Sequence, residues 1–291
     1  MASLTPSNVA PPFHGPQPGQ QEPLRHKTLQ PLPVDPATQW YGTQTPPVVR
    51  RVTVDQSSRW ISRGWEDMTR SLGISLTYGL AFVAIAYAIV LGLRQIGMTS
   101  LVLPMMAGFM LVGPLAAVGL YDISRRHGSG ETPGWRTTLS AIHGKADQLL
   151  IVGLVMMMAI LAWMMVALLI FASFYNQAPP SLDSFLMEIL SAEQAPLFLL
   201  AGTVAGGVIA AMVFTLTAIS LPMIMDRDVS AVAAMATSAR AVMKNWRVMI
   251  GWAAMIVLVT GFGLATFFIG LAISLPLIGH ASWHAYRAMV D

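Results

Sequence analysis

"GISLTYGLAFVAIAYAIVLGL", residues 73–93, decides the class of fold, because it is long, apolar and free of charged side chains. A helix needs about 20 apolar residues to cross the hydrocarbon core of a bilayer. Comparable stretches follow at 100–121, 149–174, 198–225, 248–264 and 266–286. The sequence therefore predicts an all-α fold, a polytopic transmembrane helix bundle with six spans.

The last two of these stretches are nearly continuous. A run of roughly 40 apolar residues is too long for one span, so the chain has to turn within it. Glycine is common in tight turns. The triplet "GFG", Gly261–Gly263, therefore predicts the position of this turn.

Composition supports the membrane class. Of the 291 residues, 55% are hydrophobic and 11% are charged, whereas about 25% of the residues in a soluble domain are charged. The lipid bilayer is the expected partner, and a net charge of +3 is too small to indicate nucleic-acid binding. The absence of cysteine excludes disulfides, thiolate metal sites and covalent haem attachment, and no cofactor is expected.

The N-terminal segment has a different character. Residues 1–50 hold 11 of the 19 prolines, and they show no apolar periodicity. This composition is typical of disordered, partly polyproline-like chain. We expect residues 1–50 to form a disordered cytoplasmic tail and residues 51–291 to form the six-span domain.

The basic residues predict the orientation, because cytoplasmic loops carry an excess of Lys and Arg. The segments before span 1, between spans 2 and 3, between spans 4 and 5, and after span 6 contain 16 of the 17 Lys and Arg residues. The other side has Arg94 alone, and its longest loop carries Asp183, Glu188 and Glu193. Both termini are therefore predicted to be cytoplasmic.

A short amphipathic segment precedes each pair of predicted spans. Tryptophan and basic residues on such segments suit the headgroup layer, although packing against the bundle produces the same pattern. Spans 2, 4 and 6 also end alike, in "GPLAAVGLYDISRR", "SLPMIMDRD" and "SLPLIGHASWHAYR". We expect three cytoplasmic-interface helices, and three tandem units of one such helix plus two spans. The apolar stripes are Ile61, Trp65, Met68 and Leu72; Trp135, Leu139 and Ile142; and Val229, Val232, Met235, Ala239, Val242 and Trp246.

Two segments carry a family resemblance. "SLPMIMDRDVSAVAAMATSARAVMKNW" (220–246) and "LPLIGHASWHAYR" (275–287) resemble a family of predicted prokaryotic integral membrane proteins, domain of unknown function 2189. The resemblance covers about residues 50–291. It implies a multi-pass protein of the bacterial inner membrane and no particular activity. Some relatives carry a cytochrome c oxidase label, so an association with that oxidase is one expectation.

Polar residues gather where the even-numbered spans reach the cytoplasm. His280 and His284 are four residues apart and share one face of a helix. We expect a histidine–carboxylate network there. A metal held by the two histidines and one carboxylate is the weaker alternative, because the sequence offers no firm third ligand. The predicted cluster consists of Asp122, Asp226, His280, His284 and Arg287.

Several functions are disfavoured. A catalytic haem–copper subunit needs histidines on several spans, whereas His280 and His284 are the only two within the predicted spans. A proton-coupled transporter normally has ionisable residues near the bilayer midplane, and none is found there. The five methionines of 156–165 could suit Cu(I), but three are consecutive and point in different directions, so packing is the expected role.

Small residues on the fourth predicted span indicate close helix packing. Gly202, Gly206 and Ala210 lie four residues apart, a spacing that lets helix backbones approach closely. We expect a contact within the bundle, with homodimerisation as the alternative.

No P-loop, HExxH or GxSxG motif occurs in a suitable setting. We therefore expect a non-enzymatic protein, an accessory or assembly component of a membrane complex such as a respiratory one, with membrane-protein partners. A transporter or carrier of a small or apolar solute is the alternative, and a metal-binding or redox accessory protein ranks third.

Overall fold

A computed structural model describes residues 47–98, 102–175 and 193–291 of the chain. In this part of the chain the regular secondary structure is helical, apart from one isolated antiparallel bridge between Val49 and Val290. The all-α prediction is therefore confirmed. The helices are α1 (Val54–Arg70), α2 (Leu72–Gln95), α3 (Val102–Ala116), α4 (Val118–Ser129), α5 (Trp135–Gly144), α6 (Ala146–Phe174), α8 (Ala195–Thr217), α9 (Ser220–Asp226), α10 (Ala231–Lys244), α11 (Trp246–Ala265) and α12 (Leu271–Met289).

Four helical segments within the described ranges are long and apolar enough to cross a membrane. They are Leu72–Gln95, Ala146–Phe174, Ala195–Asp226 and Trp246–Ala265. The first, third, fourth and fifth predicted spans coincide with them. The second predicted span falls on α3 and the start of α4, and the sixth on the turn before α12 and most of α12. Neither of these two meets the same criterion of length and hydropathy.

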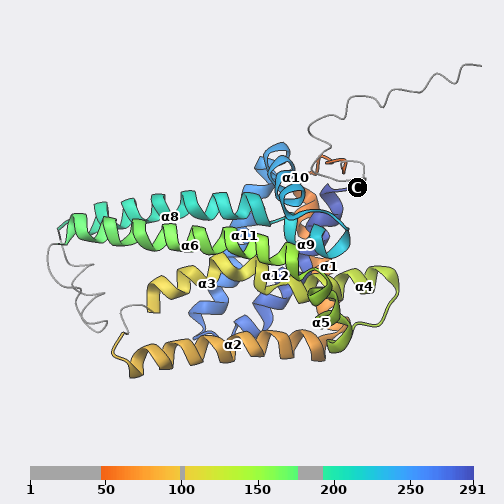
Figure 1. Cartoon of the computed structure of the whole chain (residues 1–291), viewed down its shortest axis with the longest axis horizontal. Coiled ribbons are helices and arrows are strands. Elements are labelled where there is room, and N and C mark those ends of the chain that lie inside the picture. Colours follow the sequence, from red (N-terminus) through yellow and green to blue (C-terminus); the bar gives the residue numbers. More distant parts are fainter. Residues whose placement is uncertain (1–46, 99–101, 176–192) are drawn as a thin grey trace, which may run out of the picture. The chain divides into compact units, whose positions relative to one another are not determined.

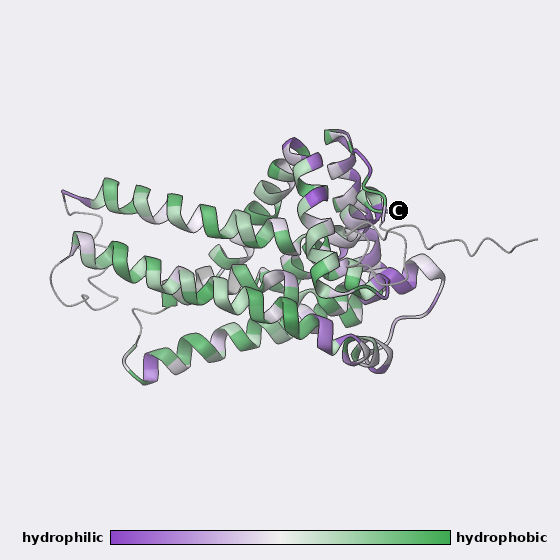
Figure 2. Cartoon of the chain, turned by 45° about the horizontal axis from the view of Figure 1, so that its top comes forward, coloured by the Kyte–Doolittle hydropathy of each residue, from purple (hydrophilic) through white to green (hydrophobic). Residues whose placement is uncertain are grey.

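Within residues 36–291, the long helices extend to one side of a group of shorter ones (Figure 1). We call α1, α4, α5, α9, α10 and the C-terminal half of α12 the cap. Hydrophilic residues gather in the cap around the C-terminus, whereas the long helices are mostly hydrophobic along their length (Figure 2). This division matches a bilayer around the long helices and water at the cap.

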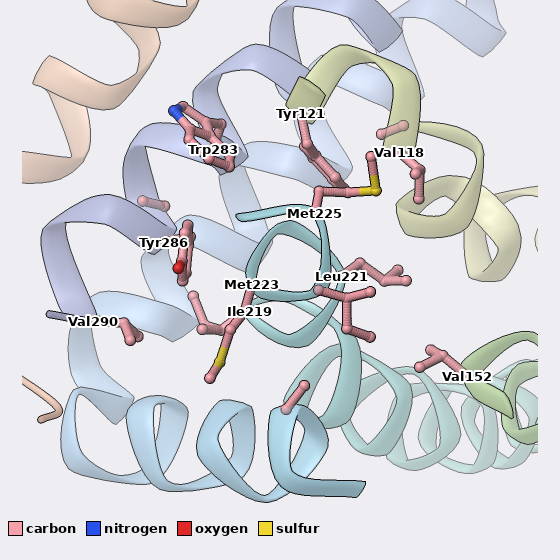
Figure 3. Packing of buried hydrophobic residues seen from close by; sticks show 14 of the residues in the cluster. Val118, Tyr121, Val152, Ile219, Leu221, Met223, Met225, Trp283, Tyr286 and Val290 are labelled. Atoms are coloured by element: carbon pink, nitrogen blue, oxygen red, sulfur yellow. The ribbon is translucent and has the colours of Figure 1, made fainter. Parts of the chain in front are cut away.

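The tightly packed core lies in the cap. Leu221, Met223 and Ile224 of α9 are fully buried, with side chains from α4, α6 and α12 around them (Figure 3). By contrast, Leu168 of α6 is 63% exposed and Val208 of α8 is 65% exposed. Apolar side chains at these positions need no protein partner in lipid, since hydrocarbon is as apolar as they are.

The predicted turn at Gly261–Gly263 is wrong. Helix α11 continues through these glycines to Ala265, and the chain turns just afterwards, where Phe267 and Phe268 have left-handed φ values of 53° and 67°. A Cβ at Gly263 would collide with the Ser274 side chain of α12. Gly263 therefore lets α11 and α12 approach each other closely, which is a second common use of glycine in apolar helices.

Helix α1 packs on α12, and its buried face differs from the predicted stripe. Its buried residues are Trp60, Gly64, Asp67 and Met68, while Trp65 is 51% exposed. A Cβ at Gly64 would lie 2.6 Å from the backbone nitrogen of Ala281, so the two helices almost touch there. This close contact turns Asp67 toward α12.

The last residues of the predicted tail belong to the fold. The Arg50 N–H donates to the Met289 carbonyl at 2.8 Å, and the Asp291 N–H donates to the Val48 carbonyl at 3.1 Å. The side chains of Arg50 and Asp291 also form an ion pair. The rest of the predicted tail, residues 1–46, lies outside the described residues.

Candidate functional site

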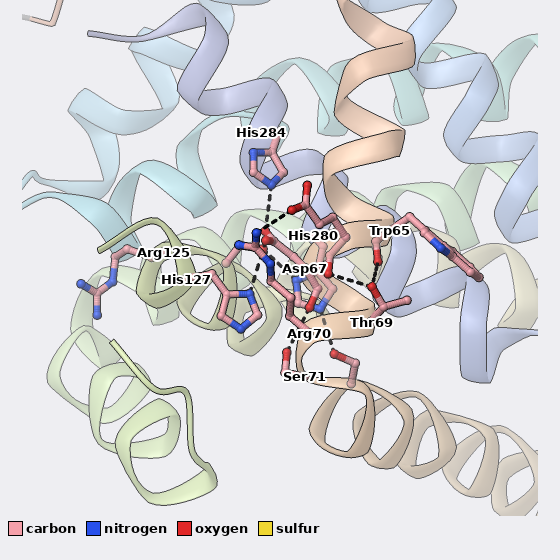
Figure 4. A network of polar contacts seen from close by, with 12 residues as sticks. Trp65, Asp67, Thr69, Arg70, Ser71, Arg125, His127, His280 and His284 are labelled. Atoms are coloured by element: carbon pink, nitrogen blue, oxygen red, sulfur yellow. Dashed lines mark hydrogen bonds and ion pairs between the residues drawn. The ribbon is translucent and has the colours of Figure 1, made fainter. Parts of the chain in front are cut away.

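A buried carboxylate lies where α1, α4 and α12 meet. The Asp67 side chain is 7% exposed. One of its oxygens lies 2.8 Å from Nε2 of His284, and the other lies 3.3 Å from Nδ1 of His127 (Figure 4). Since a carboxylate only accepts hydrogen bonds, both rings present an N–H to it.

His280 extends this contact to a fourth helix. Its ring is fully buried, with Nδ1 2.7 Å from the Ser124 hydroxyl of α4 and Nε2 3.0 Å from the Ser75 hydroxyl of α2. Ser124 also bonds to Asp67. If Ser124 donates to the carboxylate, it accepts from Nδ1–H, and Ser75 donates to Nε2. We call Ser75, Asp67, Ser124, His127, His280 and His284 the Asp67 network.

Electrostatics keep Asp67 ionised at neutral pH. Burial opposes the charge and pushes the pKa of Asp67 upward, but the hydrogen bonds from His284 and Ser124 and the nearby histidine rings outweigh it. The pKa of Asp67 is therefore lowered from its usual value of 3.8. A buried charge is tolerated only when it is paired in this way.

Asp122 belongs to a separate group. Its side chain is fully buried, and its oxygens accept from Arg125 at 2.7 Å and from Arg126 at 2.8 Å. Arg126 also pairs with Glu131 at 2.6 Å. These arginines lie one helical turn further along α4, so the carboxylate finds its partners on its own helix.

Asp226 and Arg287 come together in a third group. The Asp226 carboxylate accepts from the Tyr286 hydroxyl at 2.6 Å and from Arg287 at 2.9 Å. Arg227 donates to the same hydroxyl at 2.9 Å and to the Asp291 carbonyl at 2.6 Å. The predicted five-residue cluster is thus divided among three neighbouring groups in the cap.

Residues 102–226 match the DUF2189 family model. The family is described as predicted integral membrane proteins, so the family resemblance is confirmed for these residues. The DUF2189 match runs from α3 to α9 and includes Asp122, Ser124, His127 and Asp226. Asp67, His280 and His284 lie outside it. No curated protein and no solved structure matches the chain.

The two histidines of the metal alternative, His280 and His284, are in contact with side chains of other helices. Among residues 47–98, 102–175 and 193–291, no group of three His, Asp or Glu side chains is arranged to hold a metal ion. Both ring nitrogens of His280 are in contact with hydroxyls. His280 and His284 therefore have partners within the fold.

The sequence reasoning missed Asp67, although a signal was present. Trp60, Gly64 and Asp67 lie three or four residues apart on α1 and share one face. A carboxylate on the face that carries a tryptophan and a glycine indicates a buried polar contact. Its partner could not be read from the sequence, since His284 is 217 residues away.

The small residues of α8 have different surroundings. A Cβ at Gly206 would lie 3.0 Å from the Trp163 ring of α6, so Gly206 is part of a contact within the bundle. A Cβ at Gly202 would meet no atom within 4 Å. Ala210 is exposed and lines a cavity.

This cavity, the α8–α11 cleft, lies among α3, α8, α11 and α12. Its volume is about 430 Å³, within the range of small-molecule pockets. Most lining side chains are apolar, and the polar ones include Tyr121, Thr215, Thr260 and Ser282.

Acid should weaken the fold through Asp67. Because its pKa is lower in the folded state, Asp67 contributes stability above pH 3.8 that is lost as the pH falls through its folded-state pKa. Asp67→Asn should lose about 1–3 kcal/mol of stability at pH 7, and its melting temperature in detergent should approach that of the wild type as the pH falls below 3.8.

The difference between the melting temperatures of the wild type and Asp67→Asn, followed against pH, reports on Asp67 alone, because the other carboxylates titrate in both proteins. Asp228→Asn is the matched control, because the Asp228 side chain is 94% exposed. Wild-type and Asp67→Asn melting temperatures that differ by the same amount at pH 7 and at every pH below 3.8 would contradict the ionised network.

Proposed function

We propose that this integral membrane protein is a six-span, non-catalytic accessory or assembly component of a bacterial inner-membrane complex, with a respiratory complex as the first candidate. In this proposal α3 with the start of α4, and α12, cross the membrane beside the four apolar segments. Helices α1, α5 and α10 lie at the cytoplasmic interface, and both termini are cytoplasmic.

The order of the helices supports the three-unit architecture. Each unit begins with α1, α5 or α10 and continues with two helical segments. These segments are α2 and α3–α4 in the first unit, α6 and α8–α9 in the second, and α11 and α12 in the third. Trp65, Trp135 and Trp246 lie in or directly after α1, α5 and α10, and they are 51%, 40% and 54% exposed. Half-exposed tryptophans are typical of the membrane–water interface.

The observation that carries the accessory role is the pairing of charged side chains within the cap. Asp67 binds His284, Asp122 binds Arg126, and Asp226 binds Arg287. The first of these contacts joins α1 to α12 and the third joins α9 to α12, so they hold these helices in position. A cap held in this way suits a protein that positions partners.

A carrier of an apolar solute is the second candidate. The α8–α11 cleft favours it, because a cavity of about 430 Å³ with mostly apolar walls can hold such a molecule. Proton coupling is not required for this role.

The orientation can be tested by cysteine labelling, since the chain has no cysteine of its own. Single cysteines at Ser184 and Ser230 lie in loops predicted on opposite sides. A membrane-impermeant thiol reagent applied from outside should label the Ser184→Cys protein and spare Ser230→Cys. The reverse result would invert the orientation, and equal labelling would overturn the six-span topology.

Partners can be tested by purification. A tagged chain expressed at its natural level and extracted in mild detergent should copurify with near-stoichiometric subunits of one membrane complex, identified by mass spectrometry. An unrelated polytopic protein with the same tag is the control. Recovery of the chain alone, together with thermal stabilisation by an apolar solute, would contradict the accessory role and support the carrier.

A further inference from the structure

The α8–α11 cleft opens sideways between its two outer helices. Gly207 and Ala210 of α8 line it and are exposed. Ile250 and Val257 of α11 line it as well, and they are 62% and 53% exposed. Since these residues lie on two of the candidate spans, the opening faces the hydrocarbon of the bilayer.

The inner wall of the cleft suits a hydrocarbon chain. Met249 and Trp252 of α11 are buried there, and Leu275 and Ile278 of α12 complete the wall. The small residues on α8 leave room opposite them. An elongated apolar chain can therefore enter from the bilayer without crossing a polar barrier.

A cationic group lies beside the cap end of the cleft, although it is not part of the cleft lining. Trp246, the first residue of α11, lines the cleft and is 54% exposed. The guanidinium of Arg247 lies 5.2 Å from the centre of the Trp246 ring. Among the ion pairs of the described ranges, none involves Arg247. An arginine beside an interfacial tryptophan suits an anionic lipid headgroup.

We propose that the α8–α11 cleft binds one anionic phospholipid, with an acyl chain between α8 and α11 and the phosphate beside Arg247. The apolar opening selects a bilayer lipid, and Arg247 selects a negative headgroup. The inference uses the same cleft as the carrier hypothesis and is independent of the accessory role.

A matched pair of variants tests the chain-binding part. A Cβ at Gly207 or at Gly202 would meet no atom within 4 Å, so both tolerate a larger side chain. Gly207 lines the cleft and Gly202 does not. In delipidated protein, phosphatidylglycerol should raise the melting temperature of the wild type and of Gly202→Leu. Gly207→Leu should lose most of this shift, and native mass spectrometry should show one lipid fewer.

A second pair tests the headgroup. Arg247→Gln should reduce the preference for phosphatidylglycerol over phosphatidylcholine several-fold, whereas Arg94→Gln, at the far end of α2, should leave it unchanged. Each of the following results would overturn the proposal: equal stabilisation by both lipids, an unchanged shift in Gly207→Leu, or a dimer that Gly207→Leu abolishes without any lipid effect. Stabilisation by a long-chain alkane alone would also overturn it and would support the carrier instead.

Discussion

A carboxylate that is buried between helices has to be paired, and this requirement organises the cap. Asp67 lies on α1, ahead of the first candidate span, and its partner His284 lies near the end of the chain. The pairing therefore ties the two ends of the described chain together. The bridge between Val49 and Val290 and the ion pair of Arg50 with Asp291 act across the same junction. The compensation of the Asp67 charge comes from His284 of α12 and from Ser124 and His127 of α4, and without these partners the desolvated carboxylate would be a large cost to the fold.

The rest of the structure reflects two environments, the packed interior of the cap and the lipid around the long helices. Buried apolar residues concentrate in α9 and around it, where the helices of the cap pack on one another. The long helices keep apolar side chains on the outside, where lipid replaces water as the solvent. Close contacts between the long helices depend on glycines such as Gly79, where a Cβ would collide with the backbone of Ala272.

The sequence predicted the fold class because membrane spans are read from local composition, and four of the predicted stretches coincide with long apolar helices. It did not predict the partner of the histidines. Asp122 finds arginines one turn away on its own helix, while the rotation of α1 that brings Asp67 to His284 depends on the close approach of Gly64 and Ala281. Such a rotation depends on contacts between helices that are far apart in the sequence, so the local sequence does not reveal it. The glycines at 261–263 were misread for a similar reason, since glycine suits both a turn and a close helix contact.

The central claim is that Asp67 and His284 stabilise the cap through their mutual contact. A double-mutant cycle with Asp67→Asn, His284→Gln and the double variant, measured as free energies of unfolding in detergent at pH 7, tests it most directly. The account predicts that the losses are not additive, with a coupling energy of at least about 1 kcal/mol. Losses that add to within about 0.3 kcal/mol would show that the two side chains act independently and would contradict the account.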